Sequence, residues 1–320
     1  MRALILAAGL GTRLRPLTYL RAKAAIPVNG DALIRRIIRT LVAQGFSELV
    51  VNLHHLPATI TAAVGDGSDL GAHVRYSWEN PVLGSAGGPR HALPLLLEGD
   101  EDPRARFLLV NGDTLTDADL RGLIEAHEAA GDARVTMALI PNPQPEKYGG
   151  VVVEGDRVVA FTRRGEMTRN YHFIGLQVAE RRLFAELPDG QPAESVSQVY
   201  RALLAAHPKA IGAYVAPASF HDIGTPRDYL ETSLALAAAE GNRLLGTTGV
   251  TVESETILTD TALWDDVVIG HGAHLDHTIV CDGARVPAGA RYSGCVILPA
   301  AGRSAATGER IEDGLLISPF

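Results

Sequence analysis

Short apolar runs recur along residues 1–242 and alternate there with helical patterns. A strand inside a sheet that is covered on both faces is apolar throughout, whereas a strand with one wet face alternates apolar and polar residues. Ala3–Ala8 matches the first description throughout, and the further predicted strands are Leu49–Leu53, Phe107–Val110 and Arg134–Ile140. We expect each of them to be a central strand of one sheet.

Amphipathic helices are predicted between and after these runs. Apolar side chains follow helical spacing from Ile34 to Leu41, and Gly45 ends that pattern. Near residue 225, Thr225 can cap a helix whose first position is Pro226. Repeated strand–helix–strand units predict an α/β fold, with a Rossmann-like mixed, mostly parallel sheet and helices on both of its faces. Residues 1–242 form this domain, and an inserted hairpin is expected around residues 151–161.

The texture of the chain changes after Gly246, where helical periodicity ends. Hexads such as Val280–Arg285 and Val286–Arg291 each begin with an aliphatic residue and carry a small residue at the fifth place. A period of six with one inward aliphatic residue suits a parallel β-helix, one triangular face for each hexad. We therefore expect a short left-handed β-helix over residues 246–303, followed by a tail over residues 304–320 that begins with the polar segment Ser304–Glu309.

Charge and apolar content narrow the classes of partner. The 320 residues carry 29 basic and 37 acidic side chains, a net charge of −8, which argues against non-specific binding of nucleic acid. No stretch approaches the roughly 20 apolar residues that a membrane span needs. The apolar start is too short for a secretion signal, and Cys281 and Cys295 cannot form a disulfide framework. We expect a cytoplasmic protein without a membrane partner.

A glycine-rich turn follows the first predicted strand. Gly9 and Gly11 stand at the carboxyl end of that strand, where open α/β sheets bind ligands, and glycine N–H groups can cradle phosphate oxygens. The turn lacks the third glycine of a dinucleotide fingerprint and the Gly-Lys-Ser/Thr of a P-loop. It carries two cations instead, Arg13 and Lys23, which suit a triphosphate whose pyrophosphate must leave.

Further motifs follow this turn in a fixed order. They are Gly9–Thr18 with Lys23 and Pro27-Val28, then Glu79–Gly88, Asn111–Asp113 and His221–Pro226. Together they resemble the signature of the sugar-1-phosphate nucleotidylyltransferases over residues 1–238. The resemblance implies an enzyme that transfers a nucleoside monophosphate from a nucleoside triphosphate to a sugar-1-phosphate and releases pyrophosphate. Because the attacking phosphate oxygen is already an anion, no side-chain nucleophile is required.

The resemblance also implies roles for single residues. Arg13 and Lys23 are the expected catalytic cations. The expected nucleotide-binding residues are Leu6, Ala8, Gly9, Gly11, Thr12, Glu79, Gly84 and Ser85. A Glu79 carboxylate beside the base would accept from two donors of guanine, N1–H and the 2-amino group, but uracil and thymine offer only one ring N–H. GTP is therefore the expected nucleotide.

Two aspartates are the expected metal ligands. Asp113 and Asp222 each follow an apolar strand-like run, and the resemblance assigns both of them to Mg²⁺. Carboxylate oxygens are ligands that Mg²⁺ takes together with substrate phosphates, and a fold that brings them to one sheet edge would place the ion at the α-phosphate.

The sugar end of the site departs from the family pattern. The family carries Glu-Lys after the phenylalanine of the hairpin strand, with the lysine on the sugar phosphate, but here Arg163 and Arg164 follow. Arginine also binds phosphate, with a different reach. Arg164, Asn170 and Gly175 are the expected contacts of the sugar phosphate.

Several readings of the substrates and of the class stay open. The chain resembles mannose-1-phosphate guanylyltransferases through Leu83–Gly87 and the short β-helix, and a muramic-acid-1-phosphate uridylyltransferase through Val51–His55, Gly65–Ser68 and Ala92–Leu96. A catalytically weak regulatory relative is a further class, which Arg163-Arg164 keeps open and which the intact Arg13, Lys23, Asp113 and Asp222 oppose. An acyltransferase built on the β-helix is disfavoured by the small number of hexads. The β-helix could also pair subunits in a homo-oligomer.

Overall fold

The computed structural model describes residues 1–166, 169–246 and 248–320, and it divides into two compact units. Unit 1 comprises Met1–Gly9 and Ile34–His221, and unit 2 comprises Leu10–Leu33 and Asp222–Phe320. The division falls inside two of the predicted motifs, between Gly9 and Leu10 and between His221 and Asp222. The predicted domains 1–242, 246–303 and 304–320 follow other limits and stay predictions.

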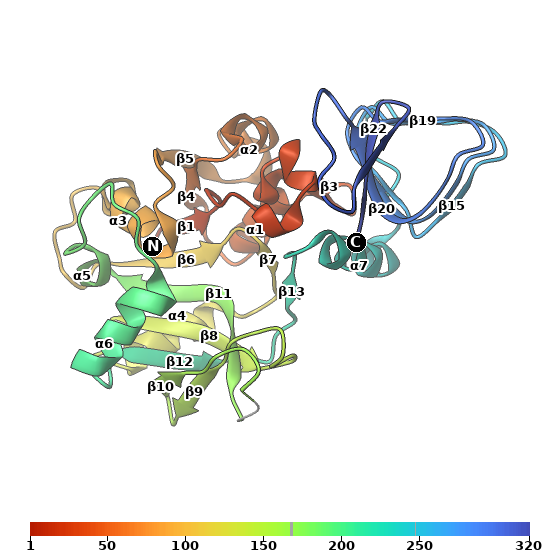
Figure 1. The fold of residues 1–320 in the computed structure, drawn as a ribbon. Helices are drawn as coiled ribbons and strands as arrows, with labels where there is room; N and C mark the ends of the chain where they lie inside the picture. Colours follow the sequence, from red (N-terminus) through yellow and green to blue (C-terminus); the bar gives the residue numbers. More distant parts are fainter. Residues whose placement is uncertain (167–168, 247) are drawn as a thin grey trace. The chain divides into compact units, whose positions relative to one another are not determined.

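Unit 1 is built on one mixed sheet (Figure 1). Within the described residues its strand order is β5 (His73–Trp78), β4 (Glu48–Leu53), β1 (Ala3–Leu6), β6 (Arg106–Asn111), β11 (Tyr171–Glu180), β8 (Val135–Pro141), β12 (Ile211–Val215), β10 (Arg157–Phe161) and β9 (Val151–Glu154). The pairings from β5 to β6 and between β8 and β12 are parallel. The pairings of β11 with β6 and β8, and of β10 with β12 and β9, are antiparallel. The prediction of a mixed sheet is confirmed, but parallel pairs do not predominate, because β11 inserts between β6 and β8.

Unit 1 also contains helices and short helical turns. They are α1 (Leu33–Ala43), α2 (Pro57–Val64), η4 (Ser68–Leu70), α3 (Gly84–Leu97), α4 (Leu120–Ala129), α5 (Arg181–Phe184), the π-helical turn η5 (Ser195–Tyr200) and α6 (Arg201–Ala206), with a short strand β7 (Thr114–Leu115) after β6. α3 packs on β1, β4, β5 and β6, and α4 packs on β8, β11 and β12. The predicted helix over Ile34–Leu41 is confirmed as α1, and its apolar residues Ile34, Ile37, Ile38 and Leu41 are buried.

Unit 2 joins an early loop to the C-terminal third of the chain. The loop holds η1 (Thr12–Leu14), η2 (Leu17–Tyr19), η3 (Lys23–Ala25), β2 (Pro27–Val28) and β3 (Asp31–Ala32), and β13 (His221–Asp222) and α7 (Pro226–Glu240) follow much later. The predicted cap of α7 is confirmed, since the Thr225 hydroxyl accepts from the Asp228 N–H at 3.2 Å.

Residues 248–299 form stacked turns of chain that we call the coil (Figure 1). Its strands are β14 (Thr251–Val252), β15 (Ile257–Thr259), β16 (Ala262–Leu263), β17 (Val268–Ile269), β18 (His274–Val280), β19 (Arg285–Val286) and β20 (Arg291–Pro299). β14 to β18 each pair in parallel with the strand one turn later, so Thr251 faces Val268 and Val268 faces Arg285. Inward aliphatic residues such as Ile269, Val280 and Val286 make its core.

The predicted tail continues the coil's sheet. β21 (Arg310–Glu312) and β22 (Leu315–Pro319) form an antiparallel pair, and β22 also pairs with β20. Residues 304–320 therefore supply two strands that extend the sheet beyond β20. The handedness of the coil stays a prediction.

Candidate active site

The end of β1 is fixed by a side chain from β4. Asn52 accepts hydrogen bonds from the Ala7 N–H at 2.5 Å and from the Ala8 N–H at 3.2 Å. These two N–H groups therefore bond to a side chain and not to a neighbouring strand. This is the physical reason why β1 ends at Leu6, although the apolar run predicted a strand through Ala8.

Glu79 completes this network from the end of β5. The side chain is 5% exposed, and its Oε1 accepts from the Asn52 amide at 2.7 Å. Its Oε2 accepts from the Leu83 N–H at 2.7 Å, just before α3. Glu79 thus links the end of β1, through Asn52, to the start of α3. Each carboxylate oxygen has a second lone pair, so the predicted contact with a base stays a prediction.

Gly84 and Ser85 begin α3 against a distant segment of unit 1. A Cβ on Gly84 would lie 2.7 Å from the Ala193 carbonyl, and the Ala86 N–H donates to that same oxygen at 2.9 Å. The Ser85 hydroxyl donates to Glu194 at 2.7 Å and accepts from the Ser195 N–H at 2.8 Å. Ser85 therefore anchors this helix start. The predicted nucleotide contacts of Gly84 and Ser85 stay predictions.

Asp113 follows the strand that lies beside β1. Leu6 faces Asn111 in the parallel pairing, and the Leu6 carbonyl accepts from the Gly112 N–H at 2.9 Å. A Cβ on Gly112 would stand 2.5 Å from that carbonyl, which is why glycine precedes the aspartate here. Asp113 is half-buried and its carboxylate accepts from the Thr114 hydroxyl at 3.2 Å. The structure thus places Asp113 at the sheet edge where β1 ends.

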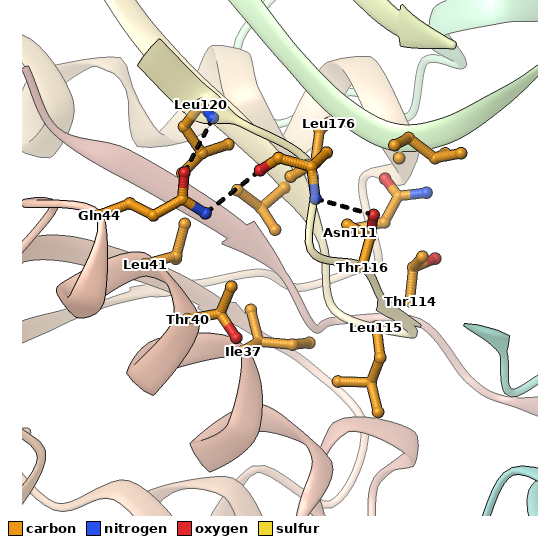
Figure 2. A pocket seen from close by; sticks show the side chains of 14 residues that line it. Ile37, Thr40, Leu41, Gln44, Asn111, Thr114, Leu115, Thr116, Leu120 and Leu176 are labelled. Atoms are coloured by element: carbon orange, nitrogen blue, oxygen red, sulfur yellow. Dashed lines mark hydrogen bonds between the residues drawn. The ribbon is translucent and has the colours of Figure 1, made fainter. Parts of the chain in front are cut away.

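A small pocket lies beneath this edge, between α1, the β6–β7 turn and β11 (Figure 2). Asn111 and Gly175 both line it, and a Cβ on Gly175 would stand 2.7 Å from the Asn111 Cβ. Gly175 has φ +80°, at a register irregularity of β11. The pocket volume of about 20 Å³ is room for about one water molecule and not for a sugar.

The glycine-rich turn continues into unit 2. Gly11 has φ +60°, and its carbonyl accepts from the Thr18 hydroxyl at 2.9 Å. A Cβ on Gly11 would lie 2.7 Å from the Thr18 methyl and 3.4 Å from the Lys23 Cβ, so the turn packs directly beside Lys23. Gly9 and Thr12 are exposed, and a Cβ on Gly9 would meet no described atom within 4 Å. The turn is held from one side and open on the other.

Arg13 and Asp222 meet around Gly224, at the start of α7. A Cβ on Gly224 would lie 3.4 Å from the Arg13 Nη1, 3.1 Å from the Asp222 Oδ2 and 3.2 Å from the Asp228 Oδ2. Unit 2 thus brings together a predicted catalytic cation and a predicted metal ligand, and adds a second carboxylate.

The donor chemistry of these residues fits Mg²⁺. Among the described residues, no group of three or more His, Cys, Asp or Glu side chains is arranged to hold a metal ion. Mg²⁺ is commonly held by one or two carboxylates together with substrate phosphates and water, so it needs no such cage. Asp113 and Asp222 are both half-buried carboxylates, a ligand type that suits this kind of site.

The predicted sugar-phosphate residues have different surroundings. Arg164 is exposed. Asn170 is buried, its Oδ1 accepts from the Asn142 amide at 2.8 Å, and a Cβ on Gly150 would stand 2.2 Å from its Cγ. Asn170 therefore holds a loop of unit 1 together, and its predicted contact with the sugar stays a prediction.

An aromatic cluster lies near Asn170 on β11. The His172 ring lies 4.3 Å from the Tyr148 ring and 4.6 Å from the Phe220 ring, measured between centroids. Burial lowers the pKa of His172 to about 4. The His172 side chain is therefore neutral at pH 7.

Sequence reasoning missed two polar residues that organise the site. Asn52 is the link between β1 and Glu79. Its signal is a polar side chain that interrupts a continuous apolar strand near the carboxyl end. Thr18 holds the Gly11 carbonyl, and its only signal is its place in the turn motif.

A model of the family described as "Nucleotidyl transferase" matches residues 2–239. The chain belongs to this family. The match confirms the family predicted from the ordered motifs, and with it the class of enzyme. It ends before the coil.

Curated relatives extend the likeness beyond the family domain. A mannose-1-phosphate guanylyltransferase of Mycobacterium tuberculosis is 31% identical over 307 residues, 92% of this chain and 82% of the relative. An N-acetylmuramate alpha-1-phosphate uridylyltransferase of Neisseria meningitidis is 46% identical over 146 residues, 45% of this chain and 60% of the relative. The family match ends at residue 239, but the first relative aligns with 92% of the chain. The first likeness therefore includes part of the coil.

Solved structures show the fold of the nucleotidyl transferase. HddC from Yersinia pseudotuberculosis, in a crystal structure complexed with GMP-PN, has a TM-score of 0.59 and 22% identity, and covers 73% of this chain and 99% of that chain. The likeness confirms a mixed α/β fold. Of the helices in the described ranges, none combines the length and apolar character that crossing a membrane requires.

Proposed function

We propose that this nucleotidyl transferase is a mannose-1-phosphate guanylyltransferase, which joins GTP and mannose-1-phosphate into a nucleoside-diphosphate sugar and releases pyrophosphate. The observation that carries the proposal is the 31% identity with an enzyme of that name over 92% of this chain. The GMP-PN held by a neighbour of similar fold supports a guanine nucleotide.

In the proposed reaction a phosphate oxygen of the sugar-1-phosphate forms a bond to the α-phosphorus, and the bond from that phosphorus to the β-phosphate oxygen breaks. Pyrophosphate leaves with that electron pair. Two polyanions must meet, so neutralisation and alignment dominate the catalysis. Arg13 and Lys23 bind and neutralise the triphosphate beside the Gly11 turn, and no residue has to remove a proton.

Asp113 and Asp222 are the residues that would hold Mg²⁺. Bound there, the ion supplies charge neutralisation and alignment at the α-phosphate. The exposed Gly9 and Thr12 and the half-buried Gly11 offer backbone N–H groups to phosphate oxygens. Leu6, Ala8, Glu79, Gly84 and Ser85 form the base side. Arg164, Asn170 and Gly175 complete the proposal at the sugar phosphate.

The proposal also covers the arrangement of helices on the sheet, the handedness of the coil, the oligomeric state and the localisation. We propose that helices cover both faces of the sheet in the Rossmann-like manner, that the coil is a left-handed β-helix, and that it pairs subunits. A crystal structure tests the helix arrangement and the handedness of the coil, and small-angle scattering in solution tests the pairing of subunits. Cytoplasmic localisation is tested by fractionation.

An N-acetylmuramate-1-phosphate uridylyltransferase is the second candidate. The 46% identity over 146 residues favours it.

Pyrophosphate release with different substrate pairs decides between the two candidates. Each of GTP, UTP and dTTP is combined with mannose-1-phosphate, N-acetylmuramate-1-phosphate or glucose-1-phosphate. GTP with mannose-1-phosphate is expected to give the highest kcat/KM. A preference for UTP with N-acetylmuramate-1-phosphate would establish the second candidate. No turnover with any pair would refute both, and would favour a regulatory relative.

A further inference from the structure

The segment that carries Arg13 and Lys23 has little structure of its own. Residues 10–33 contain three-residue helical turns and two-residue strands, η1 to η3 with β2 and β3. Isolated turns of this length have poor hydrogen-bond geometry and do not persist without packing partners. The position of both cations therefore depends on what the rest of unit 2 supplies.

Arg21, two residues before Lys23, forms ion pairs with two aspartates of the coil. Arg21 donates to both oxygens of Asp282, through Nε and Nη2, at 2.7 Å each. Its Nη2 also donates to Asp265 at 2.7 Å. The Arg21 guanidinium lies 5.4 Å from the centre of the Trp264 ring. We call these four residues the Arg21 clasp.

The two aspartates come from successive turns of the coil, and two hydrogen bonds join those turns at this point. The Asp265 N–H donates to the Asp282 carboxylate at 3.1 Å, and the Gly283 N–H donates to the Asp265 carbonyl at 3.0 Å. Their side chains are only 30% and 28% exposed, and that of Arg21 is 21% exposed. Burial alone would lower the pKa of Arg21, but the hydrogen bonds to Asp282 and Asp265 outweigh it and raise the pKa. The fork of arginine is thus met by a preformed pair of acceptors.

Further contacts fasten the same segment on both sides of the clasp. The Trp264 indole N–H donates to the Tyr229 hydroxyl at 2.8 Å, which in turn donates to the Pro27 carbonyl at 2.7 Å. Asn29 accepts from the Arg243 N–H at 2.9 Å. Before the clasp, the Arg303 guanidinium lies 5.6 Å from the Tyr19 ring centre. The coil and α7 thus hold the segment that includes Lys23.

From Arg21 the constraint reaches both cations by short steps. Lys23 opens η3, one residue beyond Ala22. Its Cβ packs on Gly11, and the Gly11 carbonyl is held by Thr18. Arg13 follows Gly11 within the same turn, η1.

We propose that the Arg21 clasp positions Lys23 and Arg13 for catalysis, so that the coil serves the reaction by holding the phosphate-binding segment in place. This inference rests on the proposed function. Arg21, Asp265 and Asp282 are positioning residues. A misplacement of about 1 Å of a catalytic group can cost about a hundredfold in rate.

The test is the double variant Asp265→Asn with Asp282→Asn, which keeps the shape and removes both charges. Pyrophosphate release is measured with the best substrate pair of the wild type, well below the unfolding temperature of each variant. We expect kcat to fall about 10- to 100-fold. KM for the sugar-1-phosphate should change little, because no sugar contact is altered.

The matched control is Arg310→Gln. Arg310 also donates to a carboxylate, that of Glu312 at 2.9 Å, and its guanidinium lies 5.9 Å from the Tyr292 ring centre. It makes these contacts among the strands of the coil's sheet, and its loss should leave kcat unaltered.

Arg21→Lys keeps the charge but cannot reach both carboxylates with a fork, and serves if the double variant does not fold. Its kcat should fall less than that of the double variant but well below wild type. Hydrogen exchange supplies a readout without activity: the amides of residues 10–33 should exchange faster in either variant. The inference is overturned if the double variant keeps the wild-type kcat and has only a lower unfolding temperature, because the clasp would then have a structural role alone. If the double variant does not fold, the same result in Arg21→Lys overturns the inference. An inactive wild type would instead refute the proposed function.

Discussion

The motif residues of unit 1 and unit 2 are held in different ways. In unit 1, Glu79 and Asn52 lie at strand ends and bond to each other and to the chain around them, buried from water. In unit 2, Arg13 is exposed on a loop of short turns, and that loop is fixed by ion pairs from residues far along the sequence. The base side is thus preorganised by the sheet, and the phosphate side by the coil and α7.

The largest effect is expected from the aspartates, one in each unit. Asp113→Asn and Asp222→Asn each remove charge from the proposed Mg²⁺ site with little change of volume. A bound metal supplies several kcal/mol to such a transition state, so kcat should fall by about a thousandfold. Turnover and the unfolding temperature are measured together, and both variants should stay folded.

The control for the aspartates is Asp119→Asn. Asp119 caps α4 by accepting from the Arg121 N–H, and asparagine caps equally well, so this variant loses a charge without losing structure. Near-normal turnover in both site variants would remove the metal assignment.

Arg13→Ala tests the phosphate side alone. The loss of one charge-assisted contact in a transition state costs about 2.7–4 kcal/mol, so the rate should fall about 100- to 1,000-fold with little loss of stability. Arg15→Ala is the matched control, because Arg15 is exposed on the same loop and stacks 5.5 Å from the Tyr19 ring centre. A decrease of less than about threefold in Arg13→Ala, against that expectation, would contradict its role at the departing pyrophosphate.

Where the sequence succeeded, the signal was local. The spacing of Ile34 and its neighbours predicted α1, and Thr225-Pro226 predicted the start of α7. The hairpin around residues 151–161 is confirmed as β9 and β10. Helix α3 had no such signal, because Pro89 and Pro94 lie inside it. Two prolines in a helical segment remove N–H donors, and tertiary packing overrides that penalty here.

The anchors of the site escaped prediction for a different reason. Arg21 and Asp282 lie far apart in sequence, and nothing in the residues next to either one indicates the pairing. Glu79 was correctly singled out as a motif residue, but its bonds to Asn52 and Leu83 depend on the register of β4 and β5. Motifs located candidate site residues, whereas the groups that hold them came from the tertiary fold.

Glu79→Gln sharpens the account of the base side. If Glu79 reads guanine, the amide replaces one acceptor with a donor, and the GTP:UTP preference should shrink about 10- to 100-fold. The same amide turns a donor toward Asn52 or Leu83, which should cost about 1–3 kcal/mol of stability. Steady-state kcat/KM for both nucleotides and urea unfolding measure the two effects.

Asn52→Ala is the control for Glu79. It breaks the bond to Glu79 from the other side and leaves the carboxylate intact. Use of GTP and UTP should then fall together. An equal loss for both nucleotides in Glu79→Gln as well would mean that Glu79 positions the strand ends and does not read the base. The comparison requires a wild type that prefers GTP.

The smallest effect distinguishes the units by pH. His127 of unit 1 is 4% exposed, and its Nδ1 lies 2.9 Å from the Thr136 hydroxyl. Burial, and then the charge of Arg106, lowers the pKa of His127 from 6.5 to about 4. Because the folded pKa lies below the unfolded value, the unfolded state binds a proton first as the pH falls. The stabilisation is complete above pH 6.5 and is lost progressively between pH 6.5 and 4.

His127→Gln can keep the bond to Thr136 and cannot titrate. At pH 5 the variant should have lost about 2 kcal/mol less of its pH 7 unfolding free energy than the wild type, because each pH unit below the unfolded pKa of His127 costs about 1.4 kcal/mol. Urea unfolding at pH 7, 6 and 5 measures the difference. His277→Gln, a change at a half-exposed histidine of the coil, 57% accessible, serves as the control. If the unfolding free energies of the wild type and of His127→Gln fall equally with pH, then His127 is not buried as a neutral side chain. Water would then reach this part of unit 1.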